Sequence, residues 1–164
     1  MVLDENEEES RLCTAHHEAG HAVVATVAGA RVEELFLAMD LDHADRFGQT
    51  TVLWPKKTPV HPKVATMLAG PVAEMIYRGE PLHPGFVAEW KQDWDQAWEI
   101  ASQIHPSERL RLQFLEQSTK ELYHWMNRDP HWAAVAAVAD LLLAHDSVEY
   151  DELVAEIGFW IERS

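Results

Sequence analysis

Hydrophobic and polar positions follow a helical period over most of the chain. From Glu8 to Val27, apolar and small residues recur every three or four positions, which is typical of one face of an amphipathic helix. Five later segments show the same period, and a proline lies at or next to the start of three of them, where a first helical turn tolerates it. The sequence predicts these helices over 62–77, 88–104, 107–127, 129–144 and 150–162.

Two short segments have the composition of strands instead. Residues 32–39 and 49–54 are rich in β-branched, aromatic and aliphatic side chains, and the polar stretch 40–48 joins them. Such a pair is typical of a β-hairpin. The predicted fold class is therefore mainly α (α+β), with one small hairpin and a long helix near the N-terminus.

Length and charge narrow the class of protein. The 164 residues suit one domain over 1–164 with a single core. The 28 acidic and 13 basic residues give a formal charge of −15, which disfavours nucleic acid and anionic membranes as partners. A hydrophobic content of 47% is too high for a disordered chain.

The single cysteine, Cys13, excludes an internal disulfide and a thiolate-rich zinc site. The acidic N-terminus does not resemble a secretory signal, and no apolar run reaches the roughly 20 residues that a membrane span needs. We expect a soluble, cytoplasmic protein.

The strongest chemical pattern is the pentad His17-Glu18-Ala19-Gly20-His21. Histidines four apart on a helix share one face, so both imidazoles can bind one zinc ion, while Glu18 is turned by about 100° and can reach a metal-bound water as a general base. The alternative is a pair of hydrogen-bonded core histidines with no metal.

A catalytic zinc site needs a third protein ligand from elsewhere in the chain. Asp93 falls on the apolar face of the predicted helix 88–104, where a carboxylate is costly unless a cation neutralises it. The alternative is a carboxylate at a helix start or in an ion pair. Glu74, near an apolar edge, is a candidate to ligate the metal or to orient a histidine. The other possible ligands are His61 and His83, both expected in loops, and Cys13.

Four segments together resemble the peptidase domain of the FtsH-type ATP-dependent zinc metalloproteases. Residues 14–25 resemble the metal-binding helix of that family, 68–79 its following helix, and 141–157 its closing helical pair. Residues 92–101 resemble the segment that supplies the third zinc ligand, an aspartate, and this implies that Asp93 has that role. The four segments occur in the family's order and span most of the chain.

The chain also departs from the family pattern. Pro71 stands where the family usually has Arg, Met75 where it has a second Glu, and residues 88–91 replace a Thr-Gly-Ala-Ser stretch. Pro71 removes a helix hydrogen bond, so we expect a kink or a local break there. The sequence contains no Gly-x-x-x-x-Gly-Lys-Ser/Thr loop, so we expect a stand-alone peptidase without the family's ATPase module and membrane anchor.

Together these features predict a zinc metalloendopeptidase that cleaves extended or unfolded polypeptides. His17, His21 and Asp93 would hold Zn²⁺, and Glu18 would deprotonate the attacking water. If the second strand lies at a sheet edge, the substrate could add to it as a strand. The candidate residues of that strand are Gln49, Thr50, Thr51, Val52, Leu53 and Trp54.

The expected partners are peptides or unfolded chains, with a separate unfoldase and self-association as open possibilities. The sequence also leaves open a second class of function, a non-catalytic, zinc-stabilised interaction module derived from such a peptidase.

Overall fold

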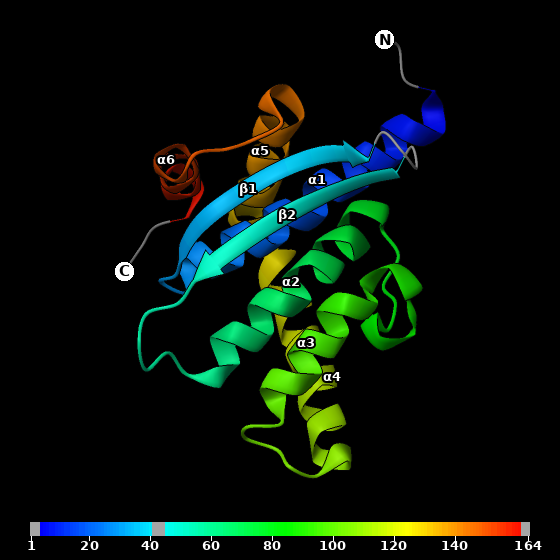
Figure 1. Ribbon diagram of the computed structural model, residues 1–164, viewed down its shortest axis with the longest axis vertical. Coiled ribbons are helices and arrows are strands. Elements are labelled where there is room, and N and C mark those ends of the chain that lie inside the picture. Colours follow the sequence, from blue (N-terminus) through cyan, green and yellow to red (C-terminus); the bar gives the residue numbers. More distant parts are fainter. Residues whose placement is uncertain (1–3, 41–44, 162–164) are drawn as a thin grey trace.

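The computed structural model describes residues 4–40 and 45–161, and it confirms a mainly helical fold with one small antiparallel sheet (Figure 1). The helices are α1 (Glu5–Val27), α2 (Val60–Arg78), α3 (Lys91–Ala101), α4 (Glu108–Met126), α5 (Asp129–His145) and α6 (Tyr150–Trp160). The strands are β1 (Arg31–Asp40) and β2 (Asp45–Leu53), and two 3₁₀ turns, η1 (Pro84–Phe86) and η2 (Ala88–Trp90), precede α3.

Several boundaries differ from the prediction. β2 begins at Asp45, so much of the predicted loop 40–48 belongs to the hairpin, while residues 41–44 lie outside the described part of the chain. The predicted helix 88–104 is replaced by the turn η2 and the shorter helix α3. Of the kink or local break predicted at Pro71, the break is wrong, because α2 continues through this buried proline.

Helix α1 crosses the molecule beneath the hairpin, with α2 on one side and α5 on another (Figure 1). Its acidic first turn is capped by Asp4, whose carboxylate accepts a hydrogen bond from the Glu7 N–H at 2.8 Å. From Ala15 onward, nearly every residue of α1 is buried up to Thr26. Val27, predicted on the apolar face, is 39% exposed because the helix leaves the core there.

A glycine allows α1 and α2 to approach closely. A Cβ atom at Gly20 would lie 2.5 Å from the carbonyl oxygen of Ala69 and 2.7 Å from the Cβ of Ala73. A side chain at position 20 would therefore push the two helices apart. This contact brings the histidine-bearing face of α1 directly against α2.

The two edges of the hairpin differ. The outer edge of β1 is covered, because the Leu37 N–H donates to the Asp146 carbonyl at 2.7 Å and the Val148 N–H donates to the Leu35 carbonyl at 3.0 Å. The residues opposite Leu35 and Leu37 are Thr50 and Gly48.

In an antiparallel pair, the backbone N–H and C=O groups of two opposite residues either both point toward the partner strand or both point away from it. The backbone groups of Gly48 and Thr50 therefore point toward the outer edge of β2. Within residues 4–40 and 45–161, no strand pairs with that edge.

Candidate metal centre

His17, His21 and Asp93 converge on one point and form a group that could hold a metal ion. The Nε2 atom of His17 lies 2.8 Å from Oδ2 of Asp93 and 3.1 Å from Nε2 of His21. The Nε2 atom of His21 lies 3.3 Å from the same Oδ2. Two elements far apart in the sequence, α1 and α3, thus supply three possible ligand atoms to one position.

The other ring nitrogen of each histidine has its own partner. Nδ1 of His21 lies 2.6 Å from the carbonyl oxygen of Thr66, and Nδ1 of His17 lies 2.9 Å from Oε2 of Glu74. A carbonyl and a carboxylate only accept hydrogen bonds, so both Nδ1 atoms carry the proton. In the neutral rings, both Nε2 atoms therefore present lone pairs toward Asp93.

Three electron-rich atoms this close together repel one another unless a cation lies between them. In a tetrahedral zinc site with bonds of about 2.0–2.1 Å, ligand atoms lie about 3.3 Å apart. The observed separations of 2.8, 3.1 and 3.3 Å need to expand by only a few tenths of an ångström to reach that value. The donor set and its spacing are therefore those of a group that could hold a metal ion.

The pKa values of the three side chains also indicate that this position favours a positive charge. Burial alone would lower the pKa of His17, but its hydrogen bonds to Asp93 and Glu74 outweigh burial and raise that pKa to about 10. The pKa of His21 is also raised, since the charge of Asp93 overcomes the effect of burial. Burial would raise the pKa of Asp93, but the neighbouring imidazoles hold it far below its usual range. A proton and a metal ion compete for this position.

Gly70 of α2 lies against the two imidazoles. A Cβ atom there would be 2.4 Å from Nε2 of His21 and 2.5 Å from Nε2 of His17. Even one methyl group would therefore occupy the space beside the metal position. The missing side chain is a requirement of the site rather than of the helix, in which glycine is intrinsically unfavourable.

Glu74 links the site to the core. Its Oε2 atom accepts hydrogen bonds from His17 and from the indole N–H of Trp90, while Oε1 lies 3.5 Å from a guanidinium nitrogen of Arg78. Trp90 is only 2% exposed, so this hydrogen bond also satisfies a buried donor. Of the two roles left open for Glu74, the structure shows the one that orients a histidine.

Glu18 is buried beside the metal position, but its side chain is held by β2 and not by the two histidines or Asp93. Its Oε2 atom accepts a hydrogen bond of 2.6 Å from the Thr50 hydroxyl, which also lies 3.2 Å from the Glu18 carbonyl oxygen. A Cβ atom at Gly48 would lie 2.5 Å from Cγ of Glu18. β2 therefore passes directly over this carboxylate and holds it in place.

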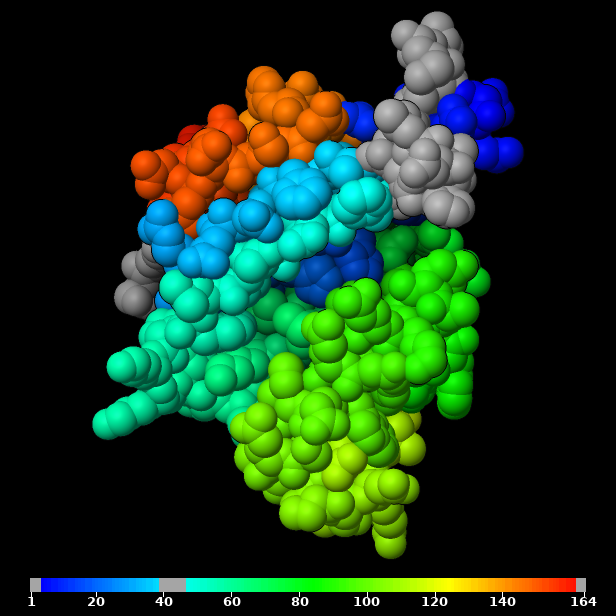
Figure 2. Space-filling view, viewed as in Figure 1, coloured from blue at the N-terminus to red at the C-terminus, as the bar shows by residue number. Residues whose placement is uncertain are grey.

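A hollow of about 160 Å³ opens between β2 and α3. Its lining includes Glu18, His21 and Asp93, together with residues of β2 and α2. Figure 2 shows this side of the molecule, where the blue surface of α1 is visible in a depression between the cyan β2 and the green helices. The carboxylate of Glu18 and two of the possible metal ligands are thus reachable from one opening.

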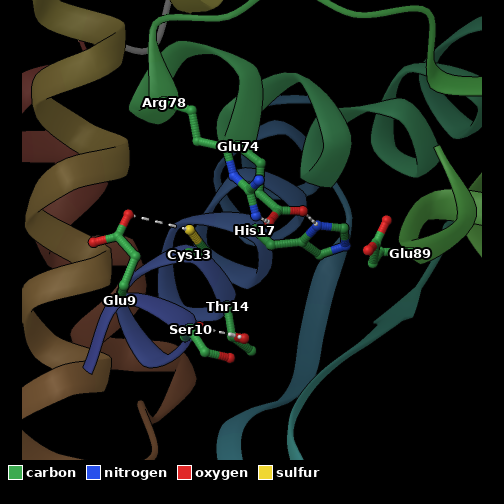
Figure 3. Close-up of a pocket in the computed structure, with 8 residues that line it drawn as sticks. All are labelled: Glu9, Ser10, Cys13, Thr14, His17, Glu74, Arg78 and Glu89. Carbon is green, nitrogen blue, oxygen red and sulfur yellow. Dashed lines mark hydrogen bonds and ion pairs between the residues drawn. The ribbon is translucent and has the colours of Figure 1, made fainter. Parts of the chain in front are cut away.

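A second and larger hollow, of about 550 Å³, reaches His17 from its Nδ1 side (Figure 3). Glu74 and Arg78 of α2 extend into it. Cys13, which lies one turn before His17 in α1, also lines it. The remaining lining residues are Glu9, Ser10, Thr14 and Glu89. Burial raises the pKa of the Cys13 thiol, which lies 3.8 Å from a carboxylate oxygen of Glu9. Cys13 is therefore a buried residue and not part of the ligand group.

The remaining histidine candidates lie elsewhere. His83 caps η1 by accepting a hydrogen bond from the Gly85 N–H, and its Nε2 lies 3.4 Å from Glu116. His61, expected in a loop, lies in the first turn of α2 and packs against Phe114. Neither belongs to the group around Asp93.

The sequence analysis missed three contributors to the site. The carbonyl of Thr66 and the indole of Trp90 orient the histidines directly or through Glu74, and no local pattern indicated either role. Gly70 did carry a signal, because a glycine inside a predicted helix suggests a close approach of another group.

Compared with known families and with curated proteins, the chain matches no family model and no curated sequence. Within the described part of the chain, no helix combines the length and the apolar character that crossing a membrane requires.

Proposed function

We propose that this protein is a zinc-dependent endopeptidase in which His17, His21 and Asp93 hold the metal. The observation that carries the proposal is the convergence of these three donors beside a buried glutamate and an open hollow. Catalytic zinc sites have three protein ligands and one open position, whereas structural sites are closed by four. Within the described residues, the group has three members.

A bound zinc ion would polarise a peptide carbonyl and lower the pKa of a coordinated water molecule. Glu18 is the group placed to move protons: its Oε2 accepts from Thr50, and none of the described residues donates a hydrogen bond to its Oε1. Glu18 accepts a proton from the attacking water and then donates it to the departing amine, so it acts first as base and then as acid.

The outer edge of β2 supports binding of an extended substrate. The backbone groups of Gly48 and Thr50 point outward there, and both residues line the hollow that contains Glu18. A peptide in extended conformation can pair with such an edge through main-chain hydrogen bonds. The proposed substrate class is therefore unfolded polypeptide or free peptide. The proposed docking element is β2, which includes the predicted residues 49–53 but ends before Trp54.

The departures from the FtsH-type pattern leave this group intact. Pro71 and Met75 are both buried, and neither contributes an atom to the ligand group. The geometry thus supports a metal site, and the resemblance supports peptidase activity at that site.

The direct test compares Glu18→Gln with Glu121→Gln, a control on the exposed face of α4. Zinc content is measured by elemental analysis, and cleavage is measured on a fluorescent unfolded polypeptide. We expect both variants to bind one zinc per chain, while Glu18→Gln loses at least about 100-fold in rate, the usual contribution of a general base. A Glu18→Gln variant as active as the control would contradict the mechanism. Zinc binding without any cleavage by the wild type would favour the non-catalytic interaction module.

A further inference from the structure

Residues 48–50 of β2 border two parts of the proposed site at once. The backbone groups of Gly48 and Thr50 point toward the outer edge of the strand, where an extended substrate is proposed to pair. The Thr50 hydroxyl and the Cβ position of Gly48 both lie against the Glu18 side chain of α1, which β2 crosses in Figure 1. This short segment therefore connects the proposed docking edge to the proposed general base.

The contact between Thr50 and Glu18 is short and largely shielded from water. Glu18 is 7% exposed, and its Oε2 accepts the hydrogen bond of 2.6 Å from the Thr50 hydroxyl. A hydrogen bond to an ionised carboxylate is stronger than one between neutral groups. At Gly48, a Cβ atom would lie 2.5 Å from Cγ and 3.2 Å from Cδ of Glu18, so the strand leaves no spare room there. The position of β2 therefore fixes the position of this carboxylate.

The next threonine along β2 lies on the opposite face of the hairpin. The Thr51 hydroxyl donates to Oε2 of Glu34 at 3.2 Å, and Glu34 is the residue opposite Thr51 in β1. Successive side chains of a strand point to opposite faces, which explains why only one of the two threonines contacts Glu18. Thr51 is therefore a matched control for Thr50.

We propose that Thr50 is a positioning residue that couples pairing of the substrate with the edge of β2 to the alignment of Glu18. This inference rests on the proposed peptidase function. A peptide that forms main-chain hydrogen bonds with Gly48 and Thr50 restrains this segment of β2, and the Thr50 hydroxyl transmits the restraint to the carboxylate. Binding energy gained away from the cleaved bond then raises the rate of the chemical step and not only the affinity.

The test compares Thr50→Val with Thr50→Ser and with the control Thr51→Val. Valine keeps the size and the branched Cβ of threonine but lacks the hydroxyl, whereas serine keeps the hydroxyl. Values of kcat and KM are measured for the zinc-loaded proteins on two peptides with the same cleaved bond. The short peptide is capped and has one residue on each side of that bond, and the long peptide extends in both directions. Zinc content and thermal unfolding are measured for every variant.

We expect the wild type to cleave the long peptide with a kcat at least about tenfold above that of the short one, the worth of one or two main-chain hydrogen bonds. Thr50→Val should lower kcat for the long peptide by about 10–100-fold, since a hydrogen bond to a charged group is worth this much. Its zinc content and KM should change little, and the ratio of the two kcat values should fall toward one. Thr50→Ser and Thr51→Val should keep the wild-type ratio.

Gly48→Ala tests the same coupling by a second route. Its methyl group would displace the Glu18 side chain while the Thr50 hydroxyl and the outer edge of β2 remain. We expect kcat for the long peptide to fall while one zinc per chain is retained. The matched control is Gly158→Ala, where a Cβ atom meets nothing within 4 Å and kcat should not change.

Two results would overturn the inference alone: a wild-type kcat that does not depend on peptide length, or a Thr50→Val protein with the same ratio of kcat values as Thr51→Val. The second result would hold even if Thr50→Val were less stable, because a purely structural role leaves that ratio unchanged. If the wild type cleaves neither peptide, or if Glu18→Gln is as active as the wild type, the proposed function fails and the inference fails with it.

Discussion

Hydrogen bonds to the far side of each imidazole decide which nitrogen faces the metal position. Glu74 does this for His17, and the carbonyl of Thr66 does it for His21. Since a backbone carbonyl cannot be removed by substitution, Glu74 is the residue at which this orientation can be tested. It is a positioning residue, because it acts on the metal through His17.

Glu74→Gln should bind zinc about 10–100-fold more weakly than the wild type, the range found for partners of metal-binding histidines. The amide is the same size, but it lacks the charge that stabilises the protonated Nδ1 and provides a poorer acceptor for both His17 and Trp90. Zinc affinity is measured by competition with a chromophoric chelator. Glu80→Gln, at an exposed position just after α2, is the control. An affinity equal to that of the control would show that Glu74 has no positioning role.

At the residue scale, the sequence predicted what depends on local spacing. His17 and His21 lie four apart on one helix, so their shared face followed from the helical period. Asp93 stood out as a carboxylate on an apolar face, and the structure places it against both imidazoles. The partners Thr66 and Trp90 could not be found this way, because their contacts depend on how α2 and η2 pack against α1.

At the scale of elements, the site depends on the close approach of α1 and α2 at two glycines. Gly20 allows the helices to touch, and Gly70 leaves room beside the imidazoles. This close approach depends on both helices together, and replacing one glycine by alanine, which adds a single methyl group, is enough to test it.

Gly70→Ala should abolish stoichiometric zinc binding, because its methyl group would lie within 2.4–2.5 Å of the Nε2 atoms of both histidines. The matched control is Gly158→Ala in α6, where a Cβ atom meets nothing within 4 Å. In that position alanine should stabilise the protein by about 0.5–1 kcal/mol through its better helix propensity. Zinc content and thermal unfolding are measured for both variants. Gly70→Ala protein that retains one zinc per chain would contradict the described packing.

Element types were easier to predict from the sequence than element ends. The helical period identified α1 to α6, although the helix predicted over 88–104 was longer than α3, and strand composition identified both strands. The hairpin is longer than predicted because polar residues such as Asp45 continue the pairing of β2. Pro71 did not break α2, because the proline lacks only one backbone donor and its ring is accommodated in the core.

For the whole molecule, the metal centre joins segments that are otherwise separate along the chain. His17 and His21 belong to α1 and Asp93 to α3, so an ion bound between them links the two helices. Metal that binds the folded state alone stabilises the fold by mass action.

Removal of zinc should lower the thermal midpoint by about 5–10 °C when the wild type is compared at zinc concentrations near 100 times the dissociation constant. Differential scanning calorimetry with and without a chelator measures this shift. His17→Ala should lose the zinc-dependent part of the stability. Equal midpoints for the wild type with and without zinc would show that no ion bridges α1 and α3.

The metal-free protein should lose stability as the pH rises from about 6.5 to about 10. The folded-state pKa of His17 is raised to about 10 from its ordinary 6.5, so its contribution is complete below 6.5 and disappears as the pH passes 10. Zinc replaces the proton, so the zinc-loaded protein should show a much smaller decline. Urea unfolding at pH 6 and pH 9, with chelator or with zinc, tests the difference. A decline of the same size in both forms would contradict the exchange of proton for metal.

The most direct test of the central claim is anomalous diffraction at the zinc absorption edge from crystals of the zinc-loaded protein. The account predicts a single peak about 2.0–2.2 Å from Nε2 of His17, Nε2 of His21 and a carboxylate oxygen of Asp93, bordering the hollow that contains Glu18. A zinc peak held by other residues, or no peak between these three side chains, would contradict it.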